Sequence, residues 1–319
     1  MFLVSLGLGC VSRPGGVEAQ EARIRRVGWL AQVPQPQLLA EFRRGLRELG
    51  YLEGSTFTLH EAYGGVTGDR LPGLAQELVN AKVDVILAEA APSVQAAQRA
   101  TKAIPIVFIT GDPVESGFVQ SLARPGGNST GIANLAWELF PKRVEVLRDA
   151  LPRLRRLVVV RTVGSAAGQA LTTKIIKDTT RAAGIEISVT VVVRTEDLDA
   201  AYADAARAGV EAILVSPNPF FNIHRDRVIA LAARYQLPAL YEFRDFVEAG
   251  GLMCYGADMK NVYRRLAGYV DKIFKGAKAG DLPVEQPTKF ELVINLKTAK
   301  ALNLAIPTAL LLRADSVIE

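Results

Sequence analysis

The sequence predicts an α/β protein made of two doubly wound, Rossmann-like lobes, and three observations predict it. Short β-rich runs alternate with longer helical patterns from residue 24 onward, which is typical of parallel sheets covered by helices. The same strand–helix series restarts after residue 140 and has about the same length. The chain has 319 residues, more than one compact domain usually contains.

The first half supplies one lobe. Gly50 directly follows a predicted amphipathic helix and suits its C-cap. Apolar runs of the kind buried on both faces predict strands, and helical spacing predicts helices between them. The strands are expected at residues 24–30, 56–62, 83–88, 106–109 and 131–135, and the helices at 37–49, 71–80 and 93–102.

The second half repeats the pattern. Gly184 and Gly209 follow two of its helices, again in C-cap positions. The helices are expected at residues 141–150, 168–183, 198–208 and 224–235, and the strands at 156–161, 186–193, 212–216, 239–241 and 251–255.

The C-terminal tail adds a helix at residues 258–275, a strand at 290–295 and a helix at 296–302. This is too little for a third domain. We therefore expect these elements to join the two existing lobes, so that the chain crosses between lobes several times. Several crossings form a hinge, which a clamping protein requires.

Composition excludes several classes of function. Hydrophobic residues make up 49% and charged residues 22%, enough apolar material for substantial cores. The net charge of +5 is spread along the chain, which argues against nucleic-acid binding. Cys254 lies in an apolar stretch and is predicted to be a small buried residue. With His60 and His224 as the only histidines, and no cysteine pair at ligand spacing, neither a metal site nor a cofactor is expected.

Residues 1–22 resemble an export signal. Residues 2–11 form a short apolar run, and residues 17–19 resemble a small-residue cleavage site before Gln20. The basic residues that normally precede such a run are missing, which fits a start placed too late. The alternatives are a disordered N-terminus and a lipid anchor at Cys10. No later apolar run is long enough to span a bilayer, so we expect a periplasmic protein.

Motifs for catalysis and nucleotide binding are absent. The first strand is not followed by Gly-x-Gly-x-x-Gly, and no phosphate-binding loop occurs. Residues 164–168 have the wrong spacing for a nucleophile elbow. His224 opens a predicted helix and His60 alternates along a strand, so both are interpreted as structural. Without a defensible acid–base pair, we expect no enzymatic activity.

In doubly wound sheets, ligands bind beyond the carboxyl ends of the strands. Aromatic side chains there are expected to enclose a ligand, and isolated charges to pair with it. On this basis Trp29→Ala and Tyr241→Ala are expected to weaken binding without unfolding the protein. The predicted ligand-binding residues are Trp29, Gln32, Glu89, Ala91, Ser93, Asp112, Asn134, Trp137, Ser165, Asn218, Phe220, Tyr241, Arg244, Tyr255 and Asp258.

Four segments of the chain carry a family resemblance. The segment at 112–131, which contains Ala-Arg-Pro-Gly-Gly-Asn-Ser-Thr-Gly, resembles a signature of the ABC-transporter substrate-binding family that includes the TrpX-like proteins. Residues 219–221, 246–253 and 286–297 match the same family. The resemblance extends from about residue 25 to residue 319.

The resemblance implies a periplasmic-binding-protein type I fold with three crossovers, placed near Leu135, Gly256 and Gln286. The N-terminal lobe then comprises 23–135 plus 257–286, and the C-terminal lobe 136–256 plus 287–319. The resemblance also implies that a small organic solute, an amino acid or an aromatic or organic acid, is handed to a permease and an ATPase. The protein is expected to be a monomer that binds no nucleic acid.

One departure affects the ligand. The loop after the third strand usually carries a Gly-Thr-Pro-like run in this family, and here it reads Ala-Ala-Pro-Ser at 90–93. Ala91 removes a hydroxyl, although Ser93 offers another one, and the backbone N–H groups where a helix starts at Ser93 suit a carboxylate. The identity of the solute therefore stays open.

Two other functions remain open from the sequence. The same lobes suit a ligand sensor that reports to a membrane receptor, and an enzyme on this fold predicts turnover of the bound compound. A LacI-like repressor is not expected, because no helix-turn-helix precedes the first lobe.

Overall fold

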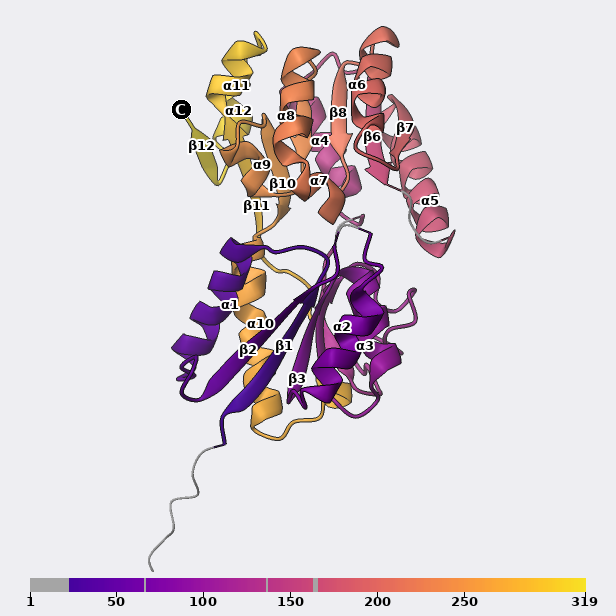
Figure 1. Cartoon of the computed structure of the whole chain (residues 1–319). Coiled ribbons are helices and arrows are strands. Elements are labelled where there is room, and N and C mark those ends of the chain that lie inside the picture. The colour runs from indigo at the N-terminus through magenta and orange to yellow at the C-terminus, as the bar shows by residue number, and fades with distance from the viewer. Residues whose placement is uncertain (1–22, 66, 136, 163–165) are drawn as a thin grey trace, which may run out of the picture.

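The computed structural model describes residues 23–65, 67–135, 137–162 and 166–319, and it contains two lobes stacked one above the other (Figure 1). One lobe surrounds a five-stranded sheet and the other a seven-stranded sheet. The predicted export signal, including Cys10, lies outside the described residues.

The N-terminal lobe contains a wholly parallel sheet. Its strand order is β2-β1-β3-β4-β5. The order doubles back at β1, as in other doubly wound sheets. The elements are β1 (Arg25–Ala31), α1 (Pro36–Glu48), β2 (Phe57–Tyr63), α2 (Leu71–Asn80), β3 (Val85–Glu89), α3 (Ala90–Ala100), β4 (Ile106–Thr110) and β5 (Ser129–Ala133).

The C-terminal lobe has the strand order β12-β11-β10-β9-β8-β6-β7. The elements, which include short ones that the sequence pattern did not predict, are α4 (Phe140–Ala150), β6 (Arg156–Thr162), α5 (Ala166–Ala183), β7 (Glu186–Val192), α6 (Asp197–Arg207), β8 (Ala212–Val215), α7 (Pro219–Ile223), α8 (Arg225–Arg234), β9 (Ala239–Tyr241), α9 (Arg244–Glu248), β10 (Met253–Ala257), β11 (Phe290–Asn295), α11 (Leu296–Ala301), α12 (Thr308–Leu311) and β12 (Ser316–Ile318).

Helices cover both faces of each sheet, which explains the continuous apolar strands. In β3, Val85 and Leu87 face a core closed by α1, while Ile86 and Ala88 face a core closed by α2 and α3. The C-terminal sheet is covered in the same way, by α6–α9 on one face and by α4, α5, α11 and α12 on the other. Cys254 is fully buried and unpaired, so the prediction of a small buried residue is confirmed.

The tail returns to both lobes. Helix α10 (Met259–Phe274) packs beside α1 in the N-terminal lobe (Figure 1). The two helices approach so closely that a Cβ at Gly45 would lie 2.6 Å from the carbonyl oxygen of Arg264. After a 3-10 turn at Ala279–Asp281, Glu285 bridges to Ile132 of the N-terminal sheet, and β11 then enters the other sheet.

The chain thus passes between the lobes three times: between β5 and α4, between β10 and α10, and before β11. β11 runs antiparallel to β10, with Met253 opposite Ile294 and Ala257 opposite Phe290. The other strand pairs of both sheets are parallel, as predicted. The reversal follows from the route of the chain, because β10 leaves the C-terminal lobe where β11 enters it. Two crossings therefore run side by side.

Among the described residues, no helix has both the length and the apolar character needed to cross a membrane.

Candidate functional site

The strands of the N-terminal sheet run toward the other lobe (Figure 1), so their carboxyl ends lie on the side where the lobes face each other. The chain leaves this sheet after β5, which pairs in parallel with β4, and β4 pairs in parallel with β3. The carboxyl ends of β4 and β3 therefore lie next to the first crossing. We call this region the facing edges; it comprises the residues that follow β1, β3, β4 and β5 in one lobe and β6, β8 and β9 in the other. Ligands of doubly wound sheets bind at such edges.

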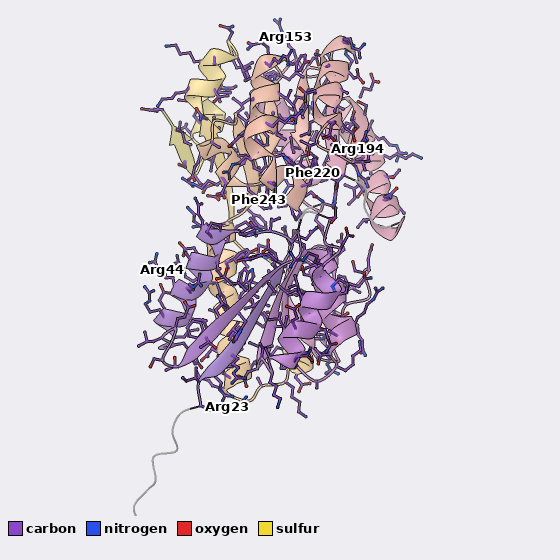
Figure 2. The ribbon with its side chains drawn as sticks, viewed as in Figure 1. Arg23, Arg44, Arg153, Arg194, Phe220 and Phe243 are labelled. Carbon is purple, nitrogen blue, oxygen red and sulfur yellow. The ribbon has the colours of Figure 1, made fainter. Side chains whose placement is uncertain are left out.

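Three of the predicted aromatic residues belong to the lobe cores instead. Trp29 is 2% exposed and packs against Phe42 and Tyr263, with ring centroids 5.5 and 5.8 Å apart. Tyr241 is 1% exposed and stacks on Phe246 at 4.7 Å. Phe220 is buried in the same core as Tyr241, although Figure 2 shows it on the side of its lobe that faces the N-terminal lobe. The expectation that Trp29 and Tyr241 offer free ring faces to a solute is corrected here.

Replacing Trp29 with alanine is therefore expected to lower the free energy of unfolding by about 3–5 kcal/mol, the usual cost of removing a large buried side chain. Urea unfolding followed by circular dichroism measures this loss. Trp137→Ala is the matched control, because that ring is only partly buried against Phe140. Equal stability of Trp29→Ala and the wild type would mean that the ring is not part of the core.

Three predicted polar residues have local structural partners. Asn218 caps α7 by accepting a hydrogen bond of 2.8 Å from the Phe220 N–H. Arg244 forms ion pairs with Glu248 at 2.7 Å and Glu291 at 2.9 Å.

Asp258 caps α10 by accepting from the Asn261 N–H at 3.0 Å, and it pairs with Lys289 at 2.9 Å. These contacts hold the helix start beside the crossing. Ser165 lies outside the described residues.

The carboxyl end of β3 carries a buried acidic group. Gln35 Nε2 donates to Glu89 Oε1, while Glu89 Oε2 is buried and has no hydrogen-bond partner. Burial raises the pKa of Glu89 to about 7, and the neighbouring Tyr263 hydroxyl acts in the opposite direction. At neutral pH this carboxyl group is poised between its two protonation states.

Helix α3 starts at Ala90, three residues earlier than predicted, so Ser93 is inside the first turn and not at its start. Pro92 fits this turn because the first backbone N–H groups of a helix have no acceptor within the helix. Proline has no backbone N–H, so no hydrogen bond is lost. The Ser93 side chain is fully buried, and its Oγ has no hydrogen-bond partner. Ala91, next to the helix start, is half-buried.

Ala90 adopts φ = +63°, a backbone conformation that favours glycine. Ala90→Gly is expected to stabilise the protein by about 0.5–1 kcal/mol. The left-handed conformation costs an alanine about 1–2 kcal/mol, and glycine avoids this cost. Part of the gain is offset because glycine makes the unfolded chain more flexible. Thermal unfolding measures the change. Ala100→Gly at the other end of α3 is the control and is expected to destabilise. A lower melting temperature for Ala90→Gly would contradict the assigned strain.

Asp112, two residues after the end of β4, also has a positive φ, +42°. Strained backbone of this kind gathers at functional sites. Burial and the neighbouring carboxyl group of Glu138 raise the pKa of Asp112 to about 6. Glu138 lies on the first crossing, so this acidic pair joins the edge of one lobe to the chain segment that leads into the other.

An ion pair in the C-terminal lobe lies next to the same crossing. Arg143 Nη2 donates to Glu242 Oε1 at 2.9 Å, and both side chains are 1% exposed. Arg143 Nε also donates to the carbonyl oxygen of Tyr255 at 2.8 Å. The pKa of Glu242 is raised, because burial outweighs the opposite effects of Arg143 and of the Asn134 side chain at the end of β5.

Two further predicted residues lie in different lobes. Tyr255 stacks on Phe290 across the paired strands β10 and β11, at 6.5 Å. Gln32 follows β1 and is half-buried.

The sequence analysis missed Gln35, Tyr263, Glu138 and Arg143. Arg143 had a detectable signal, because it falls on the apolar face of a predicted helix. The others gave none, since their roles depend on which segments the fold brings together.

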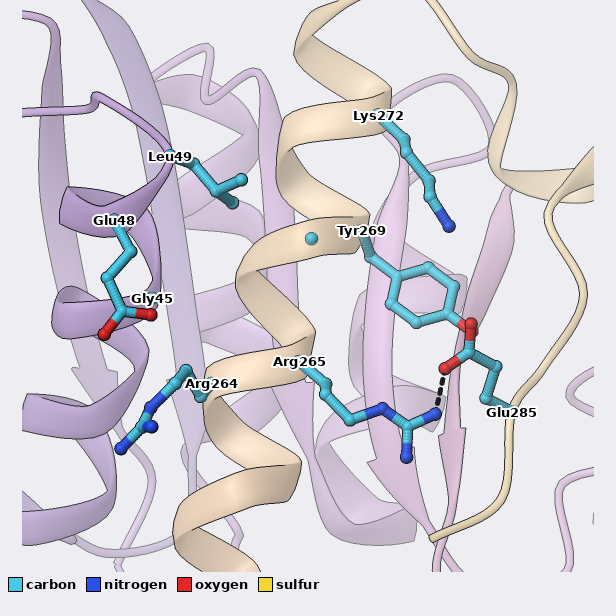
Figure 3. A pocket seen from close by; sticks show the side chains of 9 residues that line it. Gly45, Glu48, Leu49, Arg264, Arg265, Tyr269, Lys272 and Glu285 are labelled. Atoms are coloured by element: carbon cyan, nitrogen blue, oxygen red, sulfur yellow. Dashed lines mark hydrogen bonds and ion pairs between the residues drawn. The ribbon is translucent and has the colours of Figure 1, made fainter. Parts of the chain in front are cut away.

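The structure also contains a concave region away from the facing edges, between α1 and α10 (Figure 3). Its volume is about 350 Å³. Its charged groups are engaged locally: Arg265 pairs with Glu285, Arg264 with Glu41, and Lys272 lies over the Tyr269 ring. A second hollow of about 540 Å³ lies near Arg23 and Lys82, at the amino end of the N-terminal sheet. Neither coincides with the predicted site.

Two doubly wound lobes, three crossings and polar groups gathered where the lobes meet define a two-lobed ligand-binding protein. Residues 36–318 match the family described as ABC transporter substrate binding protein, and the chain belongs to this family. The predicted family and the predicted fold, that of type I periplasmic binding proteins, are confirmed.

Individual proteins agree with this assignment. The chain is 25% identical to the tyrosine-binding protein of Clostridioides difficile, over 94% of this chain and 89% of that protein. A crystal structure of a conserved domain protein from Vibrio cholerae is 28% identical, with a TM-score of 0.85 over 92% of this chain and all of that one. An ABC domain from Streptococcus pneumonia in complex with L-Trp is 24% identical, with a TM-score of 0.83 over 93% of this chain and 100% of that one.

Proposed function

We propose that this protein is an extracytoplasmic solute-binding protein that encloses an aromatic amino acid between its lobes and delivers it unchanged to a permease and its ATPase. The family supports the binding role. The main support for a binding site at the facing edges is that buried polar groups without hydrogen-bond partners cluster there.

The aromatic amino acid is supported by the kinds of relatives that match, one named for binding tyrosine and one solved with tryptophan. The facing edges add chemistry that suits such a solute. Carboxyl groups at the ends of β3 and β4 suit an amino group, and the partly exposed rings of Trp137 and Phe243 suit an aromatic side chain.

The crossings give the mechanism. A solute that contacts both edges binds the closed arrangement better than the open one, and it shifts the population of the lobes toward closure by that difference in affinity. Closure buries the solute and strengthens its polar contacts, because water no longer competes for them.

A thermal-shift screen over the twenty amino acids, aromatic amines and aromatic acids tests the proposal. We expect tyrosine or tryptophan to raise the melting temperature, since a ligand that binds only the folded state stabilises it. A screen in which no aromatic compound raises the melting temperature would contradict the proposed solute class. Mass spectrometry of the solute after long incubation tests for turnover, and we expect an unaltered mass.

A further inference from the structure

Buried polar atoms without partners are concentrated at the facing edges. Of the buried side-chain atoms without a hydrogen bond in the described part of the chain, Glu89 Oε2 and Ser93 Oγ lie at the end of β3, Asn134 Oδ1 at the end of β5 and Glu242 Oε2 at the end of β9. An unpaired buried polar group costs about 1–3 kcal/mol, so such a concentration needs an explanation. A ligand that supplies the missing partners explains it.

The unpaired atoms at the end of β3 are acceptors or hydroxyls. When Glu89 is ionised, its Oε2 can only accept a hydrogen bond, and Ser93 Oγ, one helical turn further along α3, can accept one as well. No Lys, Arg or His in the described ranges forms an ion pair with Glu89, whereas the buried carboxylates of Glu242 and Asp271 pair with Arg143 and Lys275. The group that is missing beside Glu89 is therefore a donor, and an ionised carboxylate favours a positively charged one.

The surroundings of Glu89 agree with an amino group. Burial raises the pKa values of Tyr263 from α10 and Tyr63 from β2, and the nearby charge of Glu89 adds to both shifts. Gln35, just before α1, occupies the other carboxylate oxygen. Phenol rings beside a carboxylate attract a cation through their faces as well.

Resting on the proposed function, we propose that Glu89 is the residue that selects solutes with a free, positively charged amino group, and that it disfavours solutes whose only charge is a carboxylate. A carboxylate would meet Glu89 as a like charge next to the start of α3, where Ala91 offers no hydroxyl. The selected class is aromatic amines and aromatic amino acids, and the disfavoured class is aromatic acids without an amino group.

Isothermal titration at pH 8 tests the proposal with tyrosine, tyramine and 3-(4-hydroxyphenyl)propionate, together with the tryptophan, tryptamine and indole-3-propionate series. We expect the wild type to bind the amino compounds at least about tenfold more tightly than the matching propionate, because a hydrogen bond to a charged group contributes about 1.5–3 kcal/mol. Glu89→Gln is expected to remove this preference by weakening the amines and not the propionates. Glu77→Gln, an exposed change on α2, is the matched control and should behave as the wild type.

The pH dependence separates recognition by charge from a structural effect. With a pKa of about 7, Glu89 is protonated to roughly nine-tenths at pH 6, so the affinity of the wild type for tyramine should fall about tenfold between pH 8 and pH 6. Asp112, with a pKa of about 6, titrates in part of the same range. The difference in tyramine affinity between the wild type and Glu89→Gln therefore isolates the contribution of Glu89. This difference in affinity should vanish toward pH 5.

The outcomes separate this proposal from the proposed function. If the propionates bind the wild type as tightly as the amino compounds do, or if folded Glu89→Gln keeps the preference, the selection by Glu89 is overturned while the aromatic-binding function stands. If none of the six compounds binds the wild type, both are overturned.

Discussion

Gly131→Ala is expected to produce the largest loss of stability in the chain, about 4–5 kcal/mol, with failure to fold as its extreme. Gly131 pairs with Phe108 across β4 and β5 and has φ = +150°. A Cβ there would lie 2.0 Å from the carbonyl oxygen and 2.6 Å from the amide nitrogen of Phe108. Since both are backbone atoms within a sheet, neither can move aside without breaking the strand pairing, and overpacking of this kind is among the few causes of such large losses.

Gly127→Ala is the control for Gly131→Ala. Gly127 also has a positive φ, +59°, but a Cβ there would meet nothing within 4 Å. Its replacement should cost only the backbone strain, about 1 kcal/mol. Urea unfolding, or the soluble yield where no folded protein is obtained, measures both variants. Similar losses for the two would contradict the steric explanation.

Arg143→Ala is expected to destabilise the protein by about 3–5 kcal/mol at pH 8. The change leaves Glu242 buried with no compensating charge, and breaking a buried pair by removing one partner has this cost. The Tyr255 carbonyl oxygen loses its donor as well. Lys142→Ala is the matched control: its ion pair with Glu145 is on the surface of the same helix and contributes little.

The loss in Arg143→Ala should depend on pH. The folded-state pKa of Glu242 is already above its ordinary value, and it rises further without Arg143. The folded state then binds a proton that the unfolded state does not, so the destabilisation is full above the folded pKa and smaller below it. Urea unfolding at pH 5 and pH 8 measures this difference. A loss that is the same at both values would mean that Glu242 is not the cause.

Much of the fold was predictable because both sheets are buried on both faces. Continuous apolar runs such as 85–88 mark such strands, and their alternation with amphipathic helices predicts parallel sheets. The tail was predictable from its length alone. The antiparallel β11 was not, because strand direction depends on where the chain re-enters the lobe.

The site was less predictable than the fold. Trp29 was expected at a strand end, yet β1 extends to Ala31, and residues 27, 29 and 31 all face the core that contains α1. The start of α3 was placed after Pro92, although proline is tolerated throughout the first turn. Contacts such as Glu89 with Gln35 join segments separated by more than fifty residues, and no local pattern encodes them.

The proposed function requires a solute that is held between the lobes and draws them together. Spin labels at Gln95→Cys on α3 and Arg194→Cys in the C-terminal lobe, both exposed, report the separation of the lobes when Cys10 is replaced by serine and Cys254 stays buried. Double electron–electron resonance should show a shorter distance when tyrosine or tryptophan saturates the protein. An unchanged distance distribution in the presence of a bound solute would contradict the central claim.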